Sequence, residues 1–214
     1  MSWLQASTRV SEALTRSSST ACASPTIGTT QTTRRPSHMT PLATPIVDAW
    51  RAAGIIPVMS IGNFGRNCST ALPPGDFANV IGVGALWEDN RIGLFSSRGP
   101  AVRTGILKPD ISAPGVYIKS AWNESDSDYV TESGTSMAAP HVSGAIALLL
   151  SAEPNLKYDQ VYARLISTAN QTPFNSTDPT RVDTCGNIKD TVFPNNHYGY
   201  GRLDAFSAYL GHRK

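Results

Sequence analysis

Residues 134–141 read Gly-Thr-Ser-Met-Ala-Ala-Pro-His and open an apolar run that continues over residues 142–150. Gly134 permits a tight turn and the close approach of another segment. The run is too continuous for a surface helix, so it predicts a helix buried in a core. Because the first N–H groups of a helix have no partners within it, Ser136 lies where negative charge is stabilised. The alternative is a helix that merely begins with small residues.

A second motif lies upstream, where residues 60–65 read Ser-Ile-Gly-Asn-Phe-Gly. Together the two motifs resemble the oxyanion and nucleophile segments of the subtilisin-like serine peptidases, the subtilases. The resemblance implies that Ser136 attacks the scissile carbonyl and that the Asn63 side chain donates a hydrogen bond to the oxyanion. It extends over residues 45–210. Further family-like segments follow in the family's order, at residues 79–85, 95–100, 108–115 and 198–201. Residues 48–54 and 195–199 look closest to the bacillopeptidase F branch.

The sequence changes character near residue 44. Residues 7–44 are rich in Ser, Thr and Arg, and Glu12 is their only acid. Disorder, an organelle transit peptide or a gene-model error would each explain this composition. Residues 1–3 resemble the end of a family strand. We therefore divide the chain into an anomalous leader, residues 1–44, and the C-terminal part of a subtilase catalytic domain, residues 45–214.

From residue 45 the pattern is α/β. We expect a subtilisin-like parallel sheet with helices on both faces and with the N-terminal part missing. Asn63 would lie just beyond the carboxyl end of a strand, where open parallel sheets bind ligands. A long polar connection is expected over residues 170–197. The expected helices cover residues 45–53, 155–169 and 203–210. The expected strands cover residues 55–60 and 80–83, with weaker candidates over 93–97 and 116–120.

A serine hydroxyl needs a neighbouring base, and the base needs a group that orients it. The resemblance implies Asp and His blocks before Asn63, but neither block occurs there. His38 lacks the flanking glycines, and His141 is expected to be a packed, hydrogen-bonded core residue on the helix of Ser136. His197 and His212 follow the nucleophile and match no catalytic position.

Three aspartates are also candidates for a triad role, namely Asp48, Asp76 and Asp110. We expect each of them to be solvated or to cap a turn or helix. The resemblance thus implies a serine endopeptidase whose isolated chain has almost no catalytic activity. A non-catalytic truncated homologue remains an alternative, as does a sedolisin-type acid peptidase, although Asn63 and His141 favour the subtilisin type. An α/β-hydrolase elbow would need a glycine where Ala138 stands.

Composition limits the partners and cofactors. The chain has 214 residues, a net charge of +2 and no basic-aromatic cluster, so nucleic acid is not an expected partner. The sequence contains no run of about eighteen apolar residues, so it predicts no membrane span. The Cys and His spacings that are typical of zinc sites are absent as well, so no cofactor is expected. The resemblance allows structural calcium, but no site for it is identifiable. We expect a monomer that acts on protein or peptide substrates, extracellular by resemblance although no signal peptide is present.

Three cysteines cannot all pair within one chain: Cys22, Cys68 and Cys185. If the protein is secreted, a bridge between Cys68 and Cys185 would pin the long polar connection and leave Cys22 unpaired.

Overall fold

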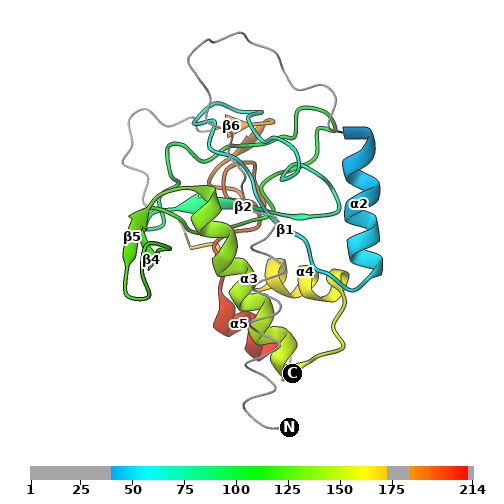
Figure 1. Ribbon diagram of the computed structural model, residues 1–214. Coiled ribbons are helices and arrows are strands. Elements are labelled where there is room, and N and C mark those ends of the chain that lie inside the picture. The colour runs from blue at the N-terminus through cyan, green and yellow to red at the C-terminus, as the bar shows by residue number, and fades with distance from the viewer. Residues whose placement is uncertain (1–39, 173–183, 212–214) are drawn as a thin grey trace.

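The computed structural model describes residues 40–172 and 184–211, and its centre is a three-stranded parallel sheet (Figure 1). The strand order is β1 (Val58–Ser60), β2 (Ile81–Leu86), β3 (Ile111–Pro114). All six residues of β2 are buried. This burial explains why β2 reads as an apolar run without alternation, since a central parallel strand is covered on both faces.

Successive residues of the strands face two different cores. Val58 and Ile81 face the larger core, whereas Met59 and Val80 face the smaller one. Because neighbouring side chains of a strand point to opposite faces, the two cores lie on opposite sides of the sheet.

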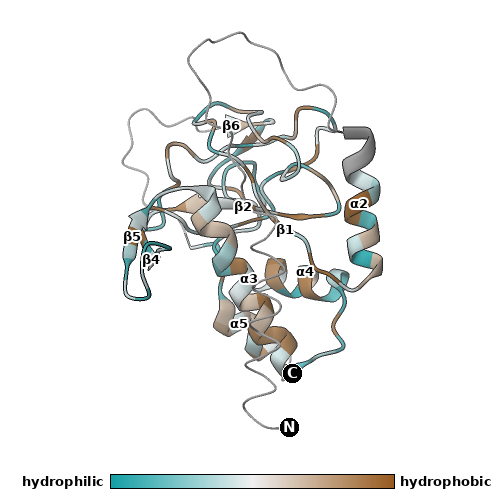
Figure 2. Ribbon diagram, in the orientation of Figure 1, coloured by the Kyte–Doolittle hydropathy of each residue, from teal (hydrophilic) through white to brown (hydrophobic). Residues whose placement is uncertain are grey.

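The smaller core is covered by α2 (Thr40–Ala52), which places Val47 and Trp50 against Met59, Phe77 and Val80. Figure 2 shows both hydrophobic and hydrophilic stretches on this helix, as expected for one buried face. The helix begins at Thr40, earlier than the predicted residue 45, and contains Pro45. Pro45 has no N–H to donate, so it removes about one helical hydrogen bond.

The larger core is covered by α3 (Thr135–Ala152), α4 (Tyr158–Ser167) and α5 (Ala205–Leu210). The predicted parallel sheet with helices on both faces is therefore confirmed. The predicted burial of the apolar helix in a core holds for one face of α3, whereas its other face leaves Leu148 62% exposed.

The helix α3 spans 18 residues with a mean hydropathy of 1.3. By length and composition it is the one helix within the described residues that could cross a membrane. It contacts all three strands of the sheet, which is the packing of a core helix in a globular domain.

Two hairpins lie outside the central sheet. The first pairs β4 (Ile118–Ala121) with β5 (Tyr129–Glu132), and the chain enters α3 directly after β5 (Figure 1). The second pairs β6 (Thr184–Cys185) with β7 (Ile188–Lys189) inside the long connection. A disulfide joins Cys68 to Cys185, which confirms the predicted pairing. Cys22 lies outside the described residues.

Several boundaries differ from the predictions for identifiable reasons. Residues 93–97 form turns instead of a strand, with the Ser96 N–H donating to the Gly93 carbonyl at 2.9 Å. The strand β3 was not predicted, because a short segment between prolines gives no strand pattern. Nor was β5, which is mostly exposed and has no apolar alternation. The predictions for residues 1–39, including His38, and for His212 lie outside the described residues.

Candidate active site

The carboxyl ends of the three parallel strands meet at one edge of the sheet, so the residues that follow them gather there. Asn63 follows β1, Trp87 follows β2 and Tyr117 follows β3. The segment that leads into α3 crosses this edge. At the β3 side the Gly134 N–H donates to the Gly115 carbonyl at 2.8 Å, and at the β1 side Thr135 contacts Asn63. The two predicted site residues, Asn63 and Ser136, are thereby brought to the same edge.

Ser136 is the second residue of α3, and its side chain is exposed. Neither its hydroxyl nor its backbone N–H makes a hydrogen bond with any of the described residues. Gly134 precedes the helix in an extended conformation and provides no side-chain cap. The start of α3 therefore offers an unfilled donor and a partial positive charge beside the Ser136 hydroxyl.

The Asn63 amide is oriented by Thr135. The Thr135 N–H donates to Asn63 Oδ1 at 2.9 Å, and the Thr135 hydroxyl donates to the same atom at 2.8 Å. Because an N–H group can only donate, the contacted atom must be the amide oxygen. Asn63 Nδ2 is consequently the outward end of the side chain, free to donate to a ligand.

The space around Asn63 Nδ2 is kept open by Gly134. A Cβ atom on Gly134 would lie 3.4 Å from Nδ2 and 3.5 Å from Met137 Sδ. A longer side chain at residue 134 would therefore crowd the amide. The loop that carries Asn63 is itself fixed, since the Phe64 N–H donates to Ser97 Oγ at 3.1 Å and the Ser97 N–H donates to the Gly62 carbonyl at 2.9 Å.

The described histidines do not supply a base to Ser136. His141 Nδ1 lies 2.9 Å from the Met137 carbonyl oxygen of its own helix, so the predicted hydrogen bond is present. The prediction that His141 is a core residue is wrong, because its side chain is exposed. His197 is 1% exposed, and its backbone N–H donates to Asn195 Oδ1 at 3.0 Å.

Two of the three aspartates are buried, contrary to the prediction that they are solvated or cap an element. Asp76 is 4% exposed and Asp110 is 6% exposed. Burial raises the pKa of the Asp76 carboxyl above its usual range, although Arg103 and Lys108 oppose that shift. Asp48 is exposed, as predicted, and accepts a hydrogen bond from Asn79 Nδ2 at 2.6 Å.

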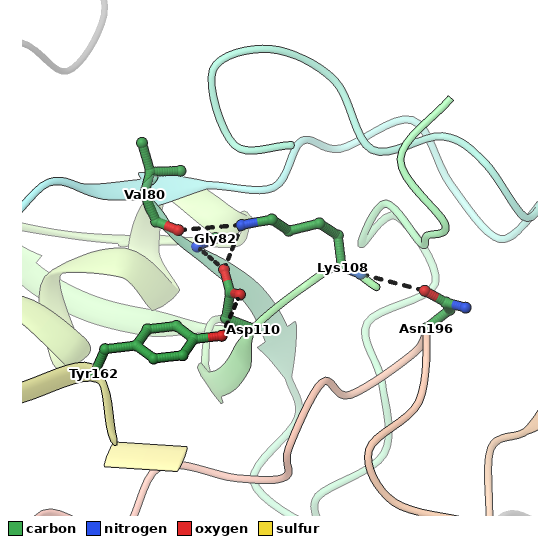
Figure 3. Close-up of polar contacts among 6 residues, drawn as sticks. All are labelled: Val80, Gly82, Lys108, Asp110, Tyr162 and Asn196. Carbon is green, nitrogen blue, oxygen red and sulfur yellow. Dashed lines mark hydrogen bonds and ion pairs between the residues drawn. The ribbon is translucent and has the colours of Figure 1, made fainter. Parts of the chain in front are cut away.

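Asp110 forms the centre of a buried polar network at the amino end of β3 (Figure 3). Its Oδ2 atom accepts from the Gly82 N–H at 2.6 Å and from Lys108 Nζ at 2.5 Å, while its Oδ1 atom accepts from the Tyr162 hydroxyl at 2.9 Å. Lys108 is only 1% exposed, and its Nζ also donates to the Val80 carbonyl at 3.1 Å. The carboxylate is satisfied and lies at the end of the sheet opposite Ser136, so it is not a partner for a catalytic base.

Sequence reasoning missed Thr135 and Lys108. The role of Thr135 depends on contact with a residue 72 positions away, which no local pattern indicates. The clearest signal for Lys108 was its place two residues before Asp110, within a family-like segment. As for metals, no group of three or more His, Cys, Asp or Glu side chains that could hold an ion occurs within residues 40–172 and 184–211.

The chain is similar to several known proteins. The model of the subtilase family matches residues 6–201. Bacillopeptidase F of Bacillus subtilis (strain 168) is 36% identical over 167 residues, covering 76% of this chain and 11% of that protein. Serine protease AprX of the same organism is 40% identical over 140 residues, covering 56% of this chain and 31% of that protein.

A solved structure, that of the CspB protease of Clostridium perfringens, has a TM-score of 0.56 and 31% identity with this chain. It covers 69% of this chain, which in turn covers 30% of that chain. The chain therefore spans less than a third of each of these three proteins.

Proposed function

The chain belongs to the subtilase family, and from that premise we propose that it carries the nucleophile and the oxyanion-binding residues of a serine endopeptidase. The observation that supports this proposal most directly is the arrangement at the carboxyl edge of the sheet. An exposed serine with an unfilled N–H begins α3, and beside it an asparagine is held so that its amide donor points outward.

In the proposed reaction, Ser136 Oγ attacks the carbonyl carbon of a peptide bond and loses its proton to a base. The carbonyl oxygen becomes an oxyanion, which accepts hydrogen bonds from Asn63 Nδ2 and the Ser136 N–H. The proton then passes to the leaving amine as the C–N bond breaks, which leaves an acyl group on Ser136. A water molecule releases the acyl group by the same sequence of steps.

The base for this reaction is not among the described residues. In serine peptidases of this type, loss of the histidine lowers the rate roughly 10⁶-fold, far more than loss of one oxyanion donor. We therefore propose that residues 1–214 alone are nearly inactive and that an Asp and a His must be supplied by another part of a complete catalytic domain.

The proposed substrates are proteins or peptides, and the proposed location is extracellular. The disulfide between Cys68 and Cys185 supports this location, because disulfides persist in oxidising compartments. The proposed unit is a monomer.

A non-catalytic homologue that binds peptides is the second candidate. It is favoured by the fact that the Ser136 hydroxyl has no hydrogen-bond partner within the described residues. A sedolisin-type acid peptidase is less well supported, because that type needs an acidic residue at the oxyanion, and the amide of Asn63 is the side chain held beside Ser136.

A fluorophosphonate probe, which reacts with activated serines, distinguishes these candidates. The 214-residue chain is expected to remain unlabelled. A longer gene product that contains the Asp and His blocks is expected to be labelled, and Ser136→Ala is expected to abolish labelling. If such a product stays unlabelled while folded, the non-catalytic alternative is correct. Stoichiometric labelling of the 214-residue chain, lost in Ser136→Ala, would show that one of its own histidines acts as the base.

A further inference from the structure

At the carboxyl edge of the sheet, where the proposed nucleophile also lies, two aromatic side chains meet. Trp87 follows β2 and Tyr117 follows β3, and their ring centroids lie 5.3 Å apart with an interplanar angle of 84°. This edge-to-face geometry is a favourable arrangement for two aromatic rings. We propose that Tyr117, supported by Trp87, contacts the substrate and binds an aromatic or other large apolar side chain of the peptide.

Tyr117 is held next to the segment that carries Ser136. Its N–H donates to Ser133 Oγ at 2.8 Å, and the neighbouring Gly115 carbonyl accepts from the Gly134 N–H at 2.8 Å. Ser133 and Gly134 come directly before the first turn of α3. Tyr117 is therefore fixed to the segment that leads to Ser136, and in the proposal a peptide whose scissile carbonyl lies at Ser136 passes its ring.

The backbone of Tyr117 is strained. Its φ is +55°, in the left-handed region that bulky residues rarely adopt. Glycine or asparagine would satisfy the same turn at a lower conformational cost. Strained conformations of this kind cluster at sites where a side chain must be held in position for function. The presence of a tyrosine at this strained position is explained if the ring itself is needed.

The ring of Tyr117 is also open to solvent, since the residue is 70% exposed. Trp87 is only partly exposed, and the Arg91 guanidinium lies over its ring at 5.4 Å from the centroid. Arg91 is paired with Asp89 at 2.6 Å, which leaves it little preference for a charged peptide side chain. Tyr117 therefore presents the exposed aromatic surface. Its ring packs against Trp87, and Arg91 packs against Trp87 in turn.

The chemistry of this surface favours an apolar occupant. An exposed aromatic ring packs well against aromatic and large aliphatic side chains, and an aromatic pair contributes about two- to tenfold in affinity beyond simple burial. This inference rests on the proposed function, because it treats Ser136 as the point where the scissile bond lies.

The test measures binding without turnover. Short blocked peptides that differ in a single residue (Tyr, Leu, Ala or Lys) are titrated against the full chain carrying Ser136→Ala. The Tyr and Leu peptides are expected to bind about two- to tenfold more tightly than the Ala and Lys peptides. Tyr117→Asn, which tolerates the positive φ, should remove this preference, whereas Tyr117→Phe should keep it. Equal binding of all four peptides by the parent, or a preference that survives in Tyr117→Asn, would overturn the proposal.

Tyr129 provides a matched control at the far end of the same hairpin. It is 65% exposed, and Lys119 lies over its ring at 5.2 Å. Tyr129→Asn should leave the peptide preference unchanged. Tyr117→Asn should also raise the melting temperature by relieving the strain at residue 117, an effect that Tyr129→Asn should not have.

A second measurement separates this inference from the proposed function. In a catalytically active longer form, Tyr117→Asn should flatten the residue preference at one position of a peptide library, with kcat/KM for aromatic substrates falling about two- to tenfold. The rate of probe labelling at Ser136 should stay unchanged. If the parent longer form is not labelled by the probe, the proposed function is contradicted. If the library profile of Tyr117→Asn equals that of the parent, only the role of Tyr117 is contradicted.

Discussion

At the amino end of the parallel sheet, Asp110 is 6% exposed and accepts three hydrogen bonds, whereas at the carboxyl end the side chain of Ser136 is exposed and has no partner among the described residues. The two ends carry polar residues of similar kinds. They differ in burial and in how completely their polar atoms are paired.

This difference separates a structural role from a chemical one. A buried carboxylate must be paired, because an unpaired charge in the interior costs several kcal/mol. Once paired with Lys108 and Tyr162, Asp110 has little capacity left for another partner. Ser136 and Asn63 stand at the surface, where water satisfies their unfilled groups until a ligand replaces it. Unfilled groups are therefore tolerated at the carboxyl end and are expensive at the amino end.

The largest expected effect is on stability, at the amino end. Lys108→Met leaves the Asp110 carboxylate buried without its cation and the Val80 carbonyl without its donor. The free energy of unfolding, measured by urea denaturation, should fall by about 3–5 kcal/mol. The matched control is Asp89→Asn in the exposed pair with Arg91, which should change it by about 1 kcal/mol or less. Similar losses for the two variants would show that burial does not distinguish these ion pairs.

The next effect is on rate, at the carboxyl end. In a catalytically active longer form, Asn63→Ala should lower kcat by about 10²–10³ because the oxyanion loses a donor. Thr135→Val removes one of the two hydrogen bonds that orient the amide and should lower kcat by less. The stability of both variants should change far less than that of Lys108→Met. A kcat for Asn63→Ala within about threefold of the parent would contradict the assignment of Asn63.

The smallest expected effect is the loss of stability at alkaline pH that is caused by Tyr162 at the amino end. Burial, followed by the charge of Asp110 and the hydrogen bond to it, raises the pKa of Tyr162 well above its usual value. The folded state then holds this proton more tightly than the unfolded chain does. Its stabilising contribution is fully present below about pH 10 and is lost as the pH rises beyond that value.

Tyr162→Phe removes this ionisable group. At neutral pH the variant should lose about 1.5–3 kcal/mol of stability, because the charged carboxylate loses a hydrogen bond. Above about pH 10 its melting temperature should fall less steeply than that of the parent. Part of the slope should remain, since burial also raises the pKa of Tyr158. An unchanged slope would show that Tyr162 is not coupled to folding; the exposed Tyr129→Phe is the control.

The sequence was most informative where function depends on short contiguous motifs. Residues 60–65 and 134–144 indicated the family, the α/β class and the two candidate site residues, since a turn and a helix start are set by neighbouring residues. The pairing of Cys68 with Cys185 could be put forward only as a conditional hypothesis. The two residues are 117 positions apart, and their meeting depends on how two loops pack.

Burial and long-range pairing could not be predicted from those motifs. Asp76 and Asp110 were expected at the surface because proline-rich turns are usually solvated, yet the packing of neighbouring segments encloses both. His141 was expected in the core because it matches a structural position of the family, yet its side chain is exposed.

The sequence by itself thus determined which residues are chemically able to form the site, namely a serine at a helix start and an asparagine after a strand. Only the tertiary structure decided how Asn63 is oriented, through Thr135, and which aromatic side chains meet at the carboxyl edge of the sheet, namely Trp87 after β2 and Tyr117 after β3. The physical reason is that the motifs act through covalent neighbours, whereas orientation and burial arise from contacts between segments that meet only when the sheet assembles.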